Sequence, residues 1–175
     1  PATLVARCRA AAEDERVHVA LLEDLGAPTP RADPAPAPAE TSLLAIALHN
    51  AVEGCVSEAF AAAIAGRQAE HVEDPGLRRI FARIAEDELR HGQLAWDLHA
   101  TFMARLDPRQ RDQVRAAQTQ ALLELIDTAR DNAEATVPEL GWPQPELAAA
   151  MARSFAREIE ARLVDPDLRL DLRAA

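Results

Sequence analysis

The chain has 175 residues and a formal net charge of −10; hydrophobic residues make up 49%, charged residues 27% and aromatic residues 3%. A chain of this length is expected to form one domain with a sizeable core. The scarcity of aromatic residues and the abundance of Ala favour an all-α fold over a β-sandwich. The negative charge argues against nucleic acid or an anionic membrane as a partner, because both require a basic surface.

Cysteine usage and targeting signals say little about the compartment. Cys8 and Cys55 are the two cysteines and form no C-x-x-C motif, so we expect free, buried thiols. No apolar run approaches the roughly 18 residues of a transmembrane helix and no signal peptide is visible, which favours a soluble, cytoplasmic protein. The sequence begins at Pro1 without a Met, inside a helical pattern, so an upstream segment or signal can belong to the protein.

Helix-breaking residues divide the chain into five predicted helices, and no strand pattern occurs. The first ends before Gly26 and is followed by five prolines between positions 28 and 38, which predict an extended crossover linker over residues 28–40. Thr41 or Ser42 can cap the second helix, and an Asp-Pro pair starts each of the next two, at 74–75 and 107–108. We expect residues 1–106 to form a helical bundle core and residues 107–175 a C-terminal helical extension packed on or beside it. The predicted helices cover residues 3–25, 42–73, 75–106, 108–132 and 146–164.

One seven-residue pattern occurs twice. Residues 12–18 read AEDERVH and residues 85–91 read AEDELRH, in a chain with only five histidines. At about 100° per residue, Glu15 and His18 fall on the apolar stripe of the first helix, and Glu88 and His91 fall on that of the third. A buried carboxylate beside a buried imidazole costs several kcal/mol unless the two are paired or bind a metal. One copy would ordinarily be a surface ion pair; the inward-facing duplicate favours a shared polar site in the core.

The second helix offers a third inward carboxylate. Glu53 shares a face with the apolar residues Val56, Phe60 and Ile64, whereas Glu58 lies about 140° away from it and is expected to be solvated. Glu53 precedes Glu88 by 35 positions, about the span of two antiparallel helices and a tight turn. We therefore expect Glu53 to meet the repeated motif at a similar depth.

These residues resemble the ferritin-like di-iron carboxylate superfamily, which includes rubrerythrins and bacterioferritins. That superfamily places a Glu on one helix and a Glu-x-x-His motif on the next, twice, in a four-helix bundle. The stretches NAVEGC (50–55) and DELRHGQLAW (87–96) are also similar to a group of bacterial ferritin-like proteins with no assigned function. The resemblance covers residues 1 to about 105 and implies an antiparallel bundle that lacks its first helix in this chain.

The resemblance also implies a role for each matching residue. The two motif glutamates would bridge two metal ions, each histidine would bind one ion, and Asp87 would orient His18 while Asp14 orients His91. The carboxylates Glu15, Glu53 and Glu88 would be the catalytic ones. The implied metal ligands are Glu15, His18, Glu53, Glu88 and His91.

Carboxylate and imidazole ligands suit two iron ions, or alternatively manganese, better than structural zinc. The resemblance therefore implies a non-haem di-iron oxidoreductase that activates dioxygen or peroxide. The sequence contains no Tyr, which excludes a tyrosyl radical within this chain, and no C-x-x-C pair for a rubredoxin-like electron inlet, so an external electron donor is expected. An organic substrate, ferrous iron and hydrogen peroxide all stay open. The alternative function is metal storage or a metal-free helical interaction scaffold.

The repeat also predicts a missing carboxylate. By the spacing of Glu53 and Glu88, the counterpart for Glu15 would lie near position −20, before the sequence begins. We expect a helix bearing this Glu on an upstream segment or on a second chain, such as another copy in a homo-oligomer, docked in an apolar groove beside the site. Glu124 in the fourth predicted helix is the internal alternative.

Overall fold

The computed structural model describes residues 2–26, 42–134 and 138–164, and all regular structure in these ranges is helical. The predicted all-α class is therefore confirmed for this part of the chain, and the predicted helices occur close to their expected bounds. The elements are α1 (Ala2–Asp24), α2 (Leu43–His49), the π-helix η1 (Asn50–Glu58), α3 (Ala59–His71), α4 (Pro75–Met103), α5 (Pro108–Glu134), the short 3₁₀ helix η2 (Pro138–Leu140) and α6 (Pro145–Val164).

The helix starts follow from local side-chain chemistry. The Asp74 carboxylate accepts hydrogen bonds from the backbone N–H groups of Gly76 and Leu77, at 2.7 and 2.8 Å, which caps α4 as predicted. Asp107 and Gln110 form a reciprocal capping box at the start of α5, with bonds of 2.9 and 3.1 Å. Ser42 caps α2 by accepting from the N–H of Ala45 at 3.1 Å.

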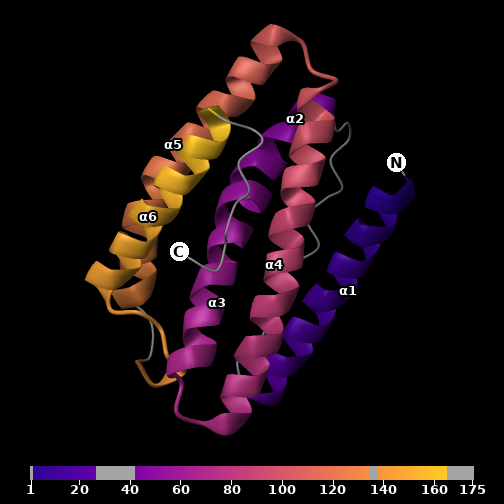
Figure 1. Ribbon diagram of the computed structural model, residues 1–175. Helices are drawn as coiled ribbons and strands as arrows, with labels where there is room; N and C mark the ends of the chain where they lie inside the picture. The colour runs from indigo at the N-terminus through magenta and orange to yellow at the C-terminus, as the bar shows by residue number, and fades with distance from the viewer. Residues whose placement is uncertain (1, 27–41, 135–137, 165–175) are drawn as a thin grey trace.

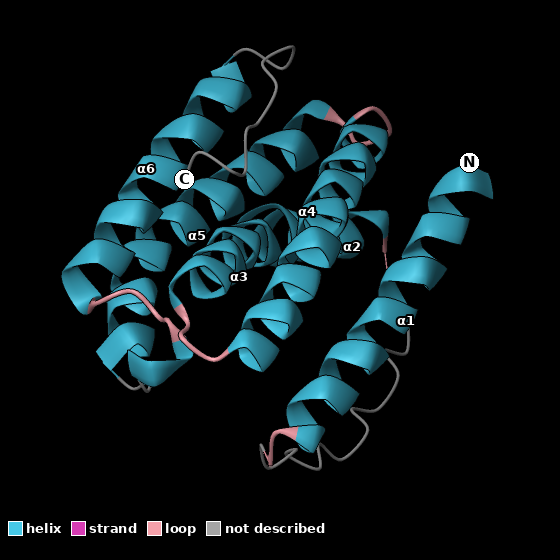
Figure 2. Cartoon of the chain, turned by 60° about the horizontal axis from the view of Figure 1, so that its bottom comes forward, coloured by secondary structure: helices cyan, strands magenta, loops and turns pink. Residues whose placement is uncertain are grey.

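The helices form a bundle around one central rod. The segments α2, η1 and α3 follow one another without a break, and this rod lies between α4 on one side and α5 with α6 on the other (Figure 1). In the turned view of Figure 2, α3 is seen nearly end-on with helices on either side, and α1 lies beyond α4. The segment on the outer side of α4 is therefore the N-terminal helix, not one of the C-terminal helices.

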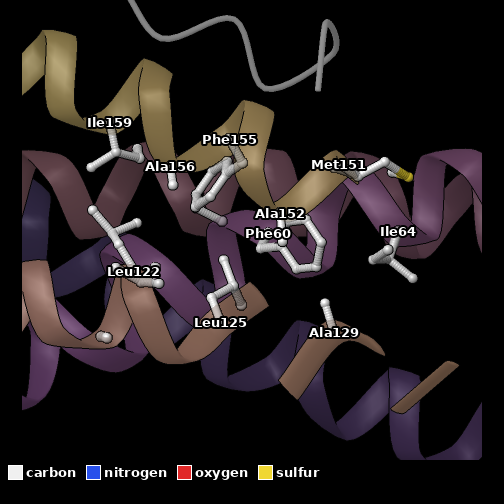
Figure 3. Packing of buried hydrophobic residues seen from close by; sticks show 14 of the residues in the cluster. Phe60, Ile64, Leu122, Leu125, Ala129, Met151, Ala152, Phe155, Ala156 and Ile159 are labelled. Carbon is white, nitrogen blue, oxygen red and sulfur yellow. The ribbon is translucent and has the colours of Figure 1, made fainter. Parts of the chain in front are cut away.

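The main apolar core lies between the central rod, α5 and α6 (Figure 3). Phe155, Leu122 and Ile159 are fully buried there, and the rings of Phe60 and Phe155 are 5.6 Å apart between centroids. Burying such side chains stabilises the fold by roughly 1.5–3 kcal/mol each. Residues on both sides of the expected boundary at position 106 thus contribute to one core.

The central rod contains a long apolar stretch. By length and composition alone, Leu43–His71 could cross a membrane, since an 18-residue window within it has a mean hydropathy of 1.2; core helices pass the same test. The rod is packed against helices on two sides, so it is apolar on more than one face. Within this stretch, 39% of the most apolar window is buried inside the protein.

Helix α1 is the least embedded of the long helices. His18 is its one buried residue, and Val5, Val19, Leu22 and Leu25 are exposed large hydrophobic side chains in or next to it. Cys8, expected to be buried, is exposed, whereas Cys55 is buried as predicted. The reason is that α1 packs against α4 alone among the described elements with substantial contact, so most of its apolar stripe has no facing helix.

Candidate metal centre

The two copies of the repeated motif meet across the interface of α1 and α4. These helices run in opposite directions (Figure 1), so residues 12–18 of one face residues 85–91 of the other. The rings of His18 and His91 lie 6.1 Å apart between centroids. The repeat therefore forms one paired site, as the sequence predicted.

Each histidine is hydrogen-bonded to the aspartate of the other copy. The Nε2 atom of His18 lies 3.0 Å from Oδ2 of Asp87, and Nε2 of His91 lies 3.3 Å from Oδ2 of Asp14. This crossed pairing holds both rings at a set angle, and it leaves both Nδ1 atoms directed elsewhere. It is the arrangement that the resemblance implied for Asp14 and Asp87.

Both Nδ1 atoms face the two motif glutamates. Nδ1 of His91 lies 3.1 Å from Glu15 and 3.5 Å from Glu88, and Nδ1 of His18 lies 3.6 Å from Glu15 and 3.5 Å from Glu88. Ligand atoms of Glu15, His18 and Glu88 all lie within 4.8 Å of one another, a spacing at which they could hold a metal ion. The two carboxylates thus lie between the two imidazoles.

Burial differs between the two copies. His18, His91, Asp87 and Glu88 have between 5% and 9% of their surface exposed, but the side chain of Glu15 is 55% exposed. The expectation that Glu15 points into the core is therefore corrected. Its carboxylate reaches the site from the rim, because α1 has no described helix on its outer side.

Electrostatics link the buried groups. Hydrogen bonding to Glu88 is the main cause that raises the pKa of His91 to about 9, against the opposing effect of burial. For Asp87, burial acts to raise the pKa, but hydrogen bonds from His18 and Arg90 outweigh it, so the net pKa is lowered. Without a metal ion, His91 is a cation and Asp87 an anion at neutral pH.

Arg90 is a part of this site that the sequence-based reasoning missed. Its guanidinium donates to Oδ1 of Asp87 at 2.6 Å and to Oδ2 of Asp14 at 3.1 Å, so it joins the two aspartates that orient the imidazoles. The sequence held one indication of this role. Arg90 stands directly before His91 in the second copy of the motif, at the position where the first copy has Val17. Both bonds come from the same nitrogen, Nη2, and Arg suits this position because its guanidinium carries several N–H donors and stays charged.

The structure overturns the predicted inward orientation of Glu53, whereas Glu58 is exposed as predicted. A π-helix is bonded from residue i to i+5, so these two glutamates, five positions apart, lie near the same face and not 140° apart. Both are exposed, and Glu53 is not directed into the core as expected. The pKa of Glu58 is raised, first by partial burial and then by the negative charge of Glu88, with smaller effects of Glu15 and Glu53.

Contacts of η1 with α4 show which glutamate lies nearer the motif. A Cβ added to Gly54 would meet Cβ of Ala95 at 2.8 Å, so these two positions face each other at very close approach. Because α4 returns antiparallel to the rod, residues after Gly54 approach Glu88, which lies seven positions before Ala95 and about 10 Å along the helix axis. Glu58 follows Gly54, whereas Glu53 precedes it. Glu58 is therefore the carboxylate of η1 nearer to Glu88 along the axis.

The remaining polar residues lie away from this cluster. Glu124 is exposed, accepts a hydrogen bond from Gln120 at 2.7 Å and lies on α5, across the rod from α4 (Figure 1), so the fold does not bring this internal alternative to the cluster. His49 and His71 are exposed. His99 is buried with its ring 5.4 Å from that of Trp96, and burial followed by the charges of Arg115 and Arg162 lowers its pKa to about 4.

Comparison of the chain with models of protein families, with curated proteins and with solved structures finds no match. The interpretation of the cluster therefore depends on its own geometry.

Proposed function

We propose that the cluster between α1 and α4 is a two-metal carboxylate centre of the ferritin-like type, and that the protein is a non-haem oxidoreductase using dioxygen or peroxide. One observation carries the proposal. Each imidazole is held through Nε2 by an aspartate of the opposite motif, and each presents Nδ1 to the same two glutamates, Glu15 and Glu88. Two equivalent nitrogen donors with two carboxylates between them are a donor set for two ions.

The chemistry of these donors favours iron or manganese. Glu15, Glu88, His18 and His91 would hold the ions, the two histidines through their Nδ1 atoms. The aspartates accept hydrogen bonds from the Nε2–H groups, which selects the tautomer with a free Nδ1 lone pair and raises its basicity. Two oxygen-rich sites with one imidazole each suit Fe or Mn, and no cysteine belongs to the described cluster. Bound iron would supply reversible one-electron chemistry toward oxygen.

Glu58 is the most suitable further carboxylate from the described chain. It lies on the turn of η1 nearest Glu88, and its pKa is raised in part by repulsion from Glu88. A cation placed among these acids would relieve that repulsion. Glu53 stays a predicted ligand, now on the far side of Gly54 from the cluster. The helix expected to carry another Glu, from an upstream segment or a second chain, also stays a prediction.

A second candidate is a metal-free scaffold in which the same residues form an ion-pair network. The observation in its favour is the position of Nδ1 of His91, 3.1 Å from Glu15 and 3.5 Å from Glu88. With the pKa of His91 raised, a protonated ring there neutralises part of the charge of both glutamates without any ion. In that case the motif would hold α1 on α4 and have no role in redox chemistry.

Metal loading separates the two functions. The full chain is incubated anaerobically with Fe(II), desalted and measured for iron content, beside the variants Glu88→Ala, His91→Ala and Glu86→Ala. Glu86 is an exposed neighbour on α4 and serves as the control. We expect about two irons per chain in the wild type and Glu86→Ala, and loss of iron in the other two. Iron-bound protein is then mixed with oxygen in a stopped-flow spectrometer, where oxidation of the bound iron is expected. The wild type is loaded with Mn(II) in a parallel sample, and absence of both metals after loading would overturn the proposal and favour the scaffold.

A further inference from the structure

An apolar groove of about 670 Å³ opens beside the cluster. Its walls come from the end of α1, from the rod at η1 and α3, from the first turns of α4 and from the last turns of α5, with the segment around η2 closing one side. The volume falls in the range of sites that bind small molecules, roughly 300–1,000 Å³. Large apolar side chains dominate the walls, among them Leu22, Phe60, Ile64, Ile84, Leu125 and Trp142.

Glu88 belongs to both the groove and the proposed metal centre. Its side chain lines the groove, and its carboxylate oxygens lie 3.5 Å from Nδ1 of His18 and of His91. Among the described residues that line the groove, Glu88 is the only charged one; the other polar ones include Ser57, Gln68 and Thr128. The groove is therefore an apolar space with Glu88 as its single charged lining residue among those described, and Glu88 is also a proposed metal ligand.

We propose that the groove binds a neutral, apolar organic molecule with one end against Glu88. The role of this molecule as the oxidised substrate rests on the proposed function, but its binding does not. Neutrality follows from the lining, because no Arg or Lys of the described chain faces the groove to pair an anionic head group, and an anion would be repelled by Glu88. An unbranched chain of about ten carbons or a two-ring aromatic molecule fits a site of this volume.

The volume also argues against a helix as the occupant. An α-helix with side chains has a diameter of at least 10 Å and a pitch of 5.4 Å, so each turn occupies about 420 Å³. The groove of about 670 Å³ would therefore take fewer than two turns, so the helix expected to carry a further Glu would have to dock elsewhere beside the cluster. A second copy of the chain brings another net charge of −10, which opposes self-association at low ionic strength.

The test uses the metal-free full chain and the neutral fluorescent probe N-phenyl-1-naphthylamine. Displacement by 1-decanol is compared with displacement by decanoate. Ala61→Trp and Thr128→Trp fill the groove from α3 and from α5, and both positions are exposed, so neither change enlarges a core side chain. Ala116→Trp, at an exposed position of α5 outside the groove, is the matched control. We expect the probe to bind at one saturable site, and decanol to displace it at a concentration at least tenfold lower than decanoate does. Both groove variants should weaken the affinity for the probe at least tenfold, and the control variant should leave that affinity unchanged.

Three results would overturn the proposal: no saturable binding, binding that the groove variants leave unchanged, or preferential displacement by decanoate. Light scattering of the same samples adds a further outcome, since a dimer that binds probe only after dissociation would show that a second copy fills the groove. The metal-free readout keeps this proposal separate from the proposed function. Probe binding without iron loading would retain the groove site and reject the metal centre, and iron loading without probe binding would do the reverse.

Discussion

The Nε2 atom of His18 lies 3.0 Å from Oδ2 of Asp87, a residue 69 positions later in the chain. Asp87 is 6% exposed and also accepts a bond of 2.6 Å from Arg90, so its orientation is well determined. Replacing Asp87 by Ala frees the imidazole of His18 and should weaken affinity for Fe(II) or Mn(II) by about 10- to 100-fold. Metal competition titrations measure the change, with Glu86→Ala as the control and circular dichroism to check the fold. Unchanged affinity would show that His18 is positioned by other contacts.

The two glutamates of η1 should differ in their effect on metal binding. Glu58 lies on the Glu88 side of Gly54 and Glu53 on the other side, so Glu58→Ala is expected to lower the affinity more than Glu53→Ala. Parallel titrations of the two single variants with Fe(II) measure both affinities and show which variant binds the metal more weakly. The reverse order would mean that metal binding converts η1 to α-helical register, which would turn Glu53 toward the site as the helical wheel predicted.

Helix α1 should be stabilised by the metal. Its one buried residue is His18, and its described ties to α4 are polar, including the ion pair of Arg7 with Asp97 and the contacts of Asp14 with His91 and Arg90. A helix with so little buried apolar surface opens at low free-energy cost. We expect amides of α1 to exchange with deuterium faster than those of α4 in metal-free protein, and to become at least tenfold more protected with iron bound. Equal protection with and without metal would contradict the proposed ligand role of Glu15 and His18.

Burial of His99 should make stability depend on pH. Its pKa is about 4 in the folded protein, below the ordinary value of 6.5, chiefly because of burial and then because of Arg115 and Arg162. Between these two values the unfolded chain binds a proton that the folded chain does not, so the free energy of unfolding falls as the pH decreases from about 6.5 to about 4. The free energy of unfolding lost over this range is roughly 3 kcal/mol. Above pH 6.5, His99 does not make the free energy of unfolding depend on pH.

His99→Phe tests this prediction, since a neutral ring retains the contact with Trp96. In urea unfolding between pH 4 and 7, the free energy of unfolding of the variant should depend less steeply on pH than that of the wild type, by up to about 1.4 kcal/mol per pH unit. His71→Phe, at an exposed position, controls for the loss of a histidine. The same slope in wild type and His99→Phe would show that His99 titrates alike in the folded and unfolded chains.

Gln118 places an amide in the core without a described partner. The side chain is fully buried, and neither its nitrogen nor its oxygen makes a hydrogen bond within the described part of the chain. A buried polar group without a hydrogen bond lowers the stability of the folded protein by about 1–3 kcal/mol. Gln118→Met, which keeps the length of the side chain, should therefore raise the free energy of unfolding by that amount. Gln113→Met, exposed on the same helix, is the control. A loss of stability in Gln118→Met would show that the amide is hydrogen-bonded in solution.

The sequence by itself determined the helices and their starts, and the repeated motif predicted one shared polar site. Caps such as Asp74 and Asp107 act within four residues, so local pattern reveals them. The resemblance carried by residues 12–18 and 85–91 implied that Asp87 would orient His18 and that Asp14 would orient His91. The distances of 3.0 and 3.3 Å agree with that expectation.

Only the tertiary structure decided what depends on neighbouring elements. The π-helical register of η1 accompanies the close approach of Gly54 to Ala95, and a wheel drawn at a constant 100° per residue cannot anticipate it. The wheel therefore placed Glu53 in the core, although Glu53 is exposed like Glu58. The exposure of Glu15 likewise reflects the position of α1 outside α4. The apolar face of a helix is buried only where another helix packs against it, which the sequence of that helix does not reveal. For the same reason the groove beside Glu88, whose walls come from α1, the rod, α4, α5 and the segment around η2, has no signature within any one of these segments.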